Sequence, residues 1–238
     1  MRKTNKYFQI IARCGIAIVI FAMVGSVVFL MGAYQPDKPI SEWNKLKSQL
    51  ASSGIDTSDL SGEVMDVDSS HGMKKYGSLQ IDDPYSTLRG CLIFALRTIS
   101  DASVDTNAML VVMKGGKILW MSDRFNGQFG GNIIGTMDLN KDGTVDIVSE
   151  WISGSRQDQR QLWIYSWDGT HGKVISSHEG GTSDLEALSF DFDEIDSGRP
   201  IEIVGQTGEY DPTSGAYVEQ GQVTYTWNGD QYGDWGKN

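Results

Sequence analysis

The chain has 238 residues, of which 31 are Asp or Glu and 20 are Lys or Arg, so its formal charge at pH 7 is −11. A surface this acidic repels phosphate groups, which excludes nucleic acid as a principal partner. Its two cysteines are Cys14 and Cys91. Because Cys14 falls in an apolar N-terminal segment, no disulfide within a folded domain is expected.

The N-terminal segment has the composition of a membrane anchor. Residues 14–33 contain no charged side chain, and about 20 apolar residues are needed to cross a bilayer as a helix. The first 34 residues contain no acid but four basic residues, Arg2, Lys3, Lys6 and Arg13. Basic residues before the span place that end in the cytoplasm. We therefore expect residues 1–34 to form an uncleaved single-pass signal anchor, with the rest of the chain in the periplasm or outside the cell.

Two alternatives to an anchor fit the sequence less well. A cleavable signal peptide has a shorter apolar core, roughly 7–15 residues, and ends in a small-x-small motif. Cleavage after Ala33 would put Met31 at the −3 position, which fits that motif poorly. A pilin-like protein would need a Glu five residues into its mature helix, and the run after Gly15 has none. The signal anchor is favoured, with cleavage left open.

Residues 35–75 are expected to form a stem. After Pro39, Ser41 can cap a short helix that runs to about Ser52, with Gly54 as its stop. Residues 55–75 are rich in Asp, Ser and Gly, which is typical of a linker or long loop. The apolar stripe of the predicted helix consists of Ile40, Trp43, Leu46 and Leu50.

The strongest chemical signal is the stretch from Asp138 to Asp146. Oxygen-bearing side chains stand at positions 1, 3, 5 and 9 of this loop, and a glycine stands at position 6, where the chain must turn sharply. Oxygen ligands bent around a glycine suit a hard cation such as Ca²⁺. The expected ligands are Asp138, Asn140, Asp142, the backbone carbonyl of Thr144, and Asp146.

The loop differs from an EF-hand. An EF-hand needs a bidentate Glu at position 12 between two helices, whereas position 12 here is Ser149. The residues that follow, 147–152, are mostly β-branched or aromatic and predict a strand. The loop resembles the short calcium loop of FG-GAP or VCBS repeats, which form the blades of integrin-α-type β-propellers. An ordinary Asp- and Gly-rich turn without metal is the alternative.

A hairpin motif recurs three times after residue 76. Strand-like runs of similar sequence end in glycine turns at Gly116, Gly169 and Gly229, which are 53 and 60 residues apart. Gly-Gly, Asp-Gly and Asn-Gly between alternating strands predict hairpins, and this period suits four-stranded blades. The resemblance to FG-GAP/VCBS repeats covers residues 130–236 well and residues 76–125 loosely.

The sequence therefore predicts an all-β domain over residues 76–238. About three propeller-like four-stranded blades follow the transmembrane helix and the short stem helix. Three blades are too few for an ordinary closed propeller, so an open or incomplete arrangement is one outcome. A second acidic loop, residues 191–202, departs from the calcium pattern through an inserted Ile195 and a Glu at position 202. Its metal binding is left open.

No catalytic motif is present. The three histidines, His71, His171 and His178, follow no ligand or catalytic spacing. Cys91 lies in an apolar run and is expected to be a buried thiol. The expectation is a non-enzymatic, membrane-anchored, calcium-binding module that mediates adhesion or serves as an accessory subunit to other membrane or envelope proteins. The alternative is an envelope enzyme acting on polysaccharide or phosphoester, or a carbohydrate-binding protein; carbohydrate is the less favoured partner.

Overall fold

A computed structural model describes residues 37–67, 75–76, 79–80, 86–98, 108–125, 131–153, 159–177, 183–194 and 198–234. The chain divides into two compact units, residues 1–44 and 45–238. The predicted membrane segment, residues 14–33, lies outside the described residues. Among the helices that are described, none is both long enough and apolar enough to cross a bilayer.

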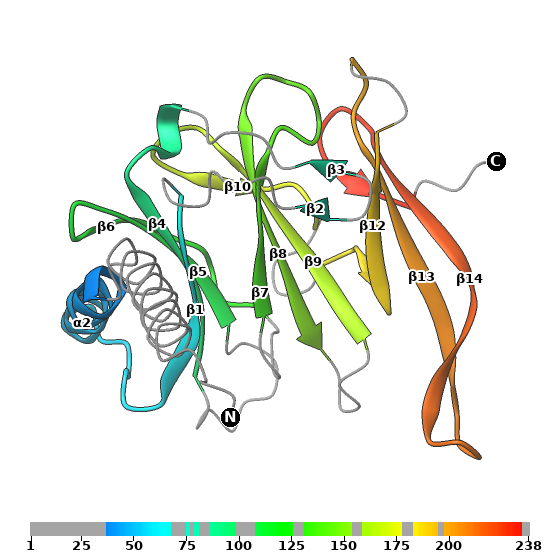
Figure 1. The fold of residues 1–238 in the computed structure, drawn as a ribbon, viewed down its shortest axis with the longest axis horizontal. Coiled ribbons are helices and arrows are strands. Elements are labelled where there is room, and N and C mark those ends of the chain that lie inside the picture. The colour runs from blue at the N-terminus through cyan, green and yellow to red at the C-terminus, as the bar shows by residue number, and fades with distance from the viewer. Residues whose placement is uncertain are drawn as a thin grey trace, which may run out of the picture. The chain divides into compact units, whose positions relative to one another are not determined.

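The described part is mostly β-structure with one α-helix (Figure 1). Three antiparallel sheets carry most of it. The helix is α2 (Asp37–Ser52), and a short 3-10 helix, η1, spans Ser86–Leu88. The strands are β1 (Leu60–Asp66), β2 (Lys75–Tyr76), β3 (Leu79–Gln80), β4 (Cys91–Thr98), β5 (Ala108–Lys114), β6 (Lys117–Met121), β7 (Gly131–Met137), β8 (Val145–Ser153), β9 (Gln159–Trp167), β10 (Gly172–Val174), β11 (Glu186–Ala187), β12 (Ser189–Asp193), β13 (Glu202–Asp211), β14 (Ala216–Trp227) and β15 (Tyr232–Gly233).

The three sheets share one design. The first sheet has the order β1-β4-β5-β6, the middle sheet β10-β9-β8-β7 with β11 also on β9, and the third sheet β12-β13-β14-β15. β2 and β3 form a separate two-stranded pair. In each large sheet the last two strands form a hairpin, and these are the three glycine-turn hairpins that the sequence predicts. Gly169 and Gly229 have φ of 103° and 106°, a region that glycine enters without steric cost.

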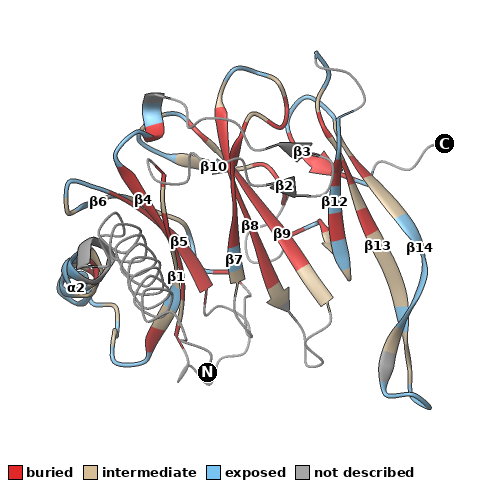
Figure 2. Ribbon diagram, in the orientation of Figure 1, coloured by how far each residue is buried: buried red, intermediate tan, exposed pale blue. Residues whose placement is uncertain are grey.

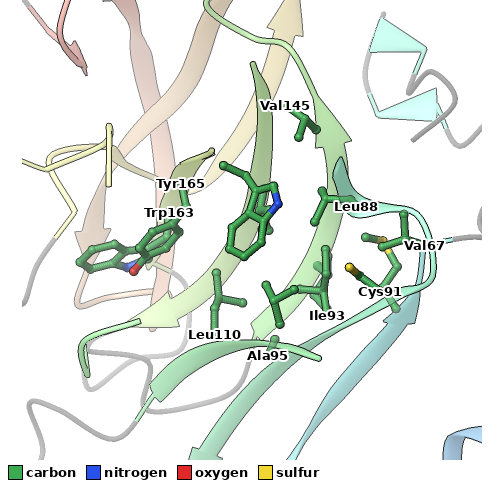
Figure 3. Packing of buried hydrophobic residues seen from close by; sticks show 14 of the residues in the cluster. Val67, Leu88, Cys91, Ile93, Ala95, Leu110, Val145, Trp163 and Tyr165 are labelled. Carbon is green, nitrogen blue, oxygen red and sulfur yellow. The ribbon is translucent and has the colours of Figure 1, made fainter. Parts of the chain in front are cut away.

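The middle sheet is buried on both faces. Successive residues of a strand point to opposite faces, so Ile147 and Val148 enter different cores. One core joins the middle sheet to the first sheet, and Figure 3 shows Ile93 and Leu110 on one side of it with Trp163 and Tyr165 on the other. The second core joins the middle sheet to the third sheet and contains Leu162 and Phe192. Figure 2 accordingly shows most of β8 and the central part of β9 in the buried colour.

Two local predictions differ from the structure. The helix starts at Asp37 rather than at Ser41, because Pro39 falls in the first turn, where its missing N–H is not needed. Its predicted end at Ser52 is confirmed. β1 lies within residues 55–75, which were predicted to be linker or loop. The prediction was wrong there because β1 contains Ser, Gly, Glu and Asp, which favour turns, and is ordered by its pairing with β4.

The C-terminal half of α2 is attached to the first sheet. Leu46 and Leu50 are fully buried, as the predicted stripe requires. The Gln49 amide donates from Nε2 to the carbonyl of Gly116 at 2.8 Å and accepts from the N–H of Ile118 at 3.0 Å. These two bonds hold the helix to the β5–β6 turn and satisfy backbone groups that the hairpin leaves open.

Candidate metal centre

The loop from Asp138 to Asp146 joins β7 to β8, where Met137 pairs with Asp146. Its turn is made by two residues in the left-handed region, Lys141 with φ of 58° and Gly143 with φ of 84°. The backbone therefore folds back on itself, as the glycine at position 6 predicts. This places the N–H groups of the turn beside the first carboxylate of the loop.

Hydrogen bonds gather the first three predicted ligands. Asp138 accepts from the N–H of Asp142 at 3.1 Å and from that of Gly143 at 3.0 Å. Asn140 accepts from the N–H of Asp142 at 3.2 Å, and its amide donates to Asp142 Oδ2 at 3.0 Å. Asp142 Oδ1 accepts from the N–H of Thr144 at 2.7 Å. Asp138, Asn140 and Asp142 thus lie around one turn.

Asp146 is the unusual member of the group. Its side chain is fully buried; Oδ2 accepts from the N–H of Leu139 at 2.9 Å, while Oδ1 has no hydrogen-bond partner. Burial, together with the negative charges of Asp142 and Asp138, raises the pKa of Asp146 to about 7. The N–H of Leu139 and the nearby hydroxyl of Ser166 oppose this rise. A buried carboxylate with an unsatisfied oxygen is costly unless a positive charge neutralises it.

Tyr232 is a neighbour of the loop that the sequence did not reveal. It comes from β15 and is fully buried, and its hydroxyl has no hydrogen-bond partner. Burial raises the pKa of Tyr232 above its ordinary value, and the charges of Asp146, Asp138 and Asp142 act in the same direction. The phenol therefore lies within electrostatic reach of all three carboxylates. No local sequence pattern indicates that Tyr232 lies near the loop, because several strands separate the two in the chain.

The donor set fits a hard divalent cation. Each carboxylate oxygen has two lone pairs, so the backbone bonds to Asp138 and Asp142 leave room for a metal. The unpartnered Oδ1 of Asp146 and the repulsion among three carboxylates are both relieved by a cation. In the described part of the chain, no three His, Cys, Asp or Glu side chains already converge as a metal site.

The second acidic loop matches the first in register but differs in chemistry. Asp193 pairs with Glu202 as Met137 pairs with Asp146, so both connections have the same length. The prediction of an inserted residue at Ile195 was therefore wrong. Glu202 then corresponds to Asp146, but it is only half-buried, and Gly198 stands where Asp142 supplies a carboxylate. Glu194, which corresponds to Asp138, forms an ion pair at 3.1 Å with Lys141 of the first loop. Within its described residues, this loop offers fewer ligands than the first.

Of the three histidines and Cys91, the structure describes His171 and Cys91, and neither belongs to the loop of residues 138–146. His171 sits in the exposed β9–β10 turn, where its Nδ1 is 2.8 Å from the hydroxyl of Thr170. His71 and His178 lie outside the described residues. Cys91 is a buried free thiol in the first core, as predicted.

No protein-family model matches the chain, and neither a curated protein nor a solved structure is significantly similar to it. The resemblance to FG-GAP/VCBS repeats therefore depends on the residues of the calcium-type loop and on the three repeated hairpins.

Proposed function

We propose that this protein is a membrane-anchored, extracytoplasmic, calcium-binding β-repeat protein that serves as an interaction module or accessory subunit of a membrane assembly. The observation that carries the calcium proposal is the buried carboxylate of Asp146 within a loop of oxygen ligands, with its Oδ1 lacking a hydrogen-bond partner. The anchor is inferred from the composition of residues 1–34.

The proposed calcium ligands are the side chains of Asp138, Asn140, Asp142 and Asp146 and the carbonyl of Thr144. Ca²⁺ would supply the positive charge that a site with three carboxylates lacks. Its role is structural, because the loop joins two strands of the middle sheet and contacts the third sheet. The N–H of Ile201 donates to the carbonyl of Leu139 at 2.8 Å. Ordering the loop therefore supports the junction between two sheets.

The stacked sheets support a propeller-like arrangement of three blades. Each large sheet contains a meander of three or four strands that ends in the same type of hairpin, and adjacent sheets bury apolar faces against each other. The described residues show three such sheets and no closed ring. An open set of blades leaves strand edges that a partner can cover.

The β13–β14 hairpin offers an accessible edge for an interaction. β12 pairs with β13 only at residues 202–206, and β15 pairs with β14 only at Thr226 and Trp227. The hairpin continues well past both neighbours, and its outer half is largely exposed (Figures 1 and 2). Val218 of β14 is 50% exposed there; it pairs with Glu209 of β13 and is followed by Glu219. We infer that a neutral or basic strand of a partner pairs with this edge.

Calcium is expected to raise the melting temperature of the full-length protein in detergent, and a chelator to lower it. Binding to the folded state alone adds roughly 2.7 kcal/mol at a hundredfold excess of calcium over Kd. Asp142→Ala should remove the calcium response. Asp168→Ala is the matched control, because Asp168 also accepts turn N–H groups but lies outside the loop. If the wild-type melting curve is identical in calcium and in chelator, the loop is an ordinary turn that binds no calcium.

A photo-crosslinking residue at Val218 is expected to capture a defined partner in native membranes. The same residue at Leu119, which is 43% exposed on β6, serves as the control and should not yield that species. Mass spectrometry of the crosslinked band identifies the partner. If the protein is recovered from the membrane fraction as an uncrosslinked monomer at its natural abundance, the accessory-subunit proposal fails.

A further inference from the structure

The turn between β14 and β15 lies against one end of the middle sheet. The N–H of Tyr232 on β15 donates to the carbonyl of Ile175, just after β10, at 2.8 Å. Lys173 Nζ lies 2.7 Å from Asp230 Oδ1, but both side chains are exposed, so this ion pair adds little stability. The backbone bond and the fully buried side chain of Tyr232 therefore fix β15 at this place.

One row of the middle sheet leads from that end to the calcium-type loop. Lys173 of β10 pairs with Ser166 of β9, and Ser166 pairs with Asp146 of β8. Residues opposite each other in an antiparallel ladder lie on the same face of the sheet. The third sheet packs on that face, since Val148, two residues after Asp146, belongs to the second core together with Tyr232. Asp146 and Tyr232 thus face the same interior from neighbouring sheets.

Two polar atoms in this interior find no hydrogen-bond partner among the described residues. They are Oδ1 of Asp146 and the hydroxyl of Tyr232, and both side chains are fully buried. Burial raises the pKa of the Tyr232 phenol, and among the loop carboxylates Asp146 contributes more to the rise than Asp138 or Asp142. An acceptor and a donor without partners are therefore enclosed together, where bulk water satisfies neither.

A hydrogen bond from Tyr232 to Asp146 is compatible with a bound cation. The phenol O–H donates, and each oxygen of a carboxylate has two lone pairs, so Oδ1 can accept from Tyr232 and still face a metal. A carboxylate that binds a metal is ionised. Because hydrogen bonds to ionised acceptors are roughly twice as strong as neutral ones, this bond contributes most when the loop holds its cation.

We propose that Tyr232 is a positioning residue of the calcium site, whose hydroxyl donates to Oδ1 of Asp146 in the calcium-bound protein and orients that carboxylate. The proposal rests on the proposed calcium function and gives the third sheet a part in it. Partners of this kind hold metal ligands in place without touching the metal. Calcium binding is then coupled to the docking of β15, because the donor comes from that strand.

The test measures calcium affinity by isothermal titration calorimetry of the full-length protein in detergent, after metal is removed with a chelator. Tyr232→Phe keeps the ring that packs on Trp227 at 5.4 Å and removes the hydroxyl. It should weaken calcium binding about tenfold. In chelator its melting temperature should equal or exceed that of the wild type, because the substitution removes a buried hydroxyl that has no partner. A purely structural tyrosine would show the reverse, a lower melting temperature at unchanged affinity.

Tyr225→Phe is the matched control. Tyr225 lies in the same core, but its hydroxyl donates to the carbonyl of Glu186 at 2.6 Å. Its loss should lower the melting temperature and leave the calcium affinity unchanged. NMR of protein labelled with ¹³C at tyrosine Cζ adds a direct readout. The resonance that is missing from Tyr232→Phe should shift when calcium is added to the wild type.

Three results would overturn the proposal. If the wild type binds calcium and Tyr232→Phe binds it equally tightly, the role of Tyr232 fails while the calcium site stands. If Tyr232→Phe and Tyr225→Phe weaken binding equally, the effect belongs to the core in general and not to a bond with Asp146. If the wild type binds no calcium, the calcium site fails and the role of Tyr232 fails with it.

Discussion

Replacing Asp146 with Asn is expected to stabilise the calcium-free protein and to abolish its response to calcium. Asn keeps an oxygen for the N–H of Leu139 and removes the buried negative charge. Raising the pKa of the carboxyl from 3.8 to about 7 corresponds to roughly 4 kcal/mol lost from the folded state once the group is ionised. We expect the free energy of unfolding at pH 8 in chelator to rise by about 2–4 kcal/mol.

The pH dependence follows from the same shift. Below pH 3.8 the carboxyl of Asp146 is protonated in both states and carries no penalty. Between 3.8 and about 7 the folded state retains a proton that the unfolded state releases, so the stability of the calcium-free protein falls as pH rises. Urea unfolding in chelator at several pH values should show this slope in the wild type and a weaker one in Asp146→Asn.

Asp168→Asn provides the control for this experiment. Asp168 is exposed in the β9–β10 turn, and Asn retains its acceptor oxygen there. Its effect should stay within about 0.5 kcal/mol, with or without calcium. If Asp146→Asn instead destabilises the chelated protein and leaves the calcium response intact, Asp146 is neither an uncompensated charge nor a calcium ligand.

Trp151→Ala should produce the largest loss of stability. Trp151 is 1% exposed in the core between the first and middle sheets, and its ring lies edge to face with Phe125 at 5.0 Å. Its Nε1 donates to the hydroxyl of Ser149 at 3.0 Å, so the substitution leaves a cavity and also removes that bond. The expected loss is about 3–5 kcal/mol, measured as a shift of the urea midpoint at constant slope.

Leu119→Ala is the control for the core substitution. Leu119 lies on β6 of the first sheet, but its side chain is 43% exposed. Its truncation should cost about 0.5 kcal/mol or less. Equal effects of the two substitutions would contradict the packing of the first sheet on the middle sheet.

Local sequence patterns predicted the hairpins and the turn of the loop. Asp168-Gly169 and Asn228-Gly229 demand a turn conformation that few residue pairs adopt, and the alternating residues on either side specify strands. The position of Gly143 among the acidic residues of the loop likewise predicts where the backbone reverses direction. These features depend on neighbours within a few residues, so one sequence suffices to find them.

Features that depend on contacts between sheets could not be predicted. β1 lacks a strand pattern and is ordered by β4, which lies about 30 residues later in the chain. The burial of Asp146 and its proximity to Tyr232 require the third sheet to lie against the middle one. A pocket beside Trp163 is likewise lined by residues of different sheets, since β6 belongs to the first sheet and β9 to the middle one. Periodicity indicates that a residue is buried, but not which residue it meets.

The double burial of the middle sheet has a consequence for biosynthesis. Residues that complete its second core, such as Phe192 and Ile203, are translated after the middle sheet itself. Until they are made, the face formed by Ile134, Leu162 and Ile164 has no covering layer. A chain that stops early would display this apolar face to chaperones and proteases. Chaperones and proteases can therefore distinguish a truncated chain from a full-length one, because only the full-length chain has a third sheet to cover this face of the middle sheet.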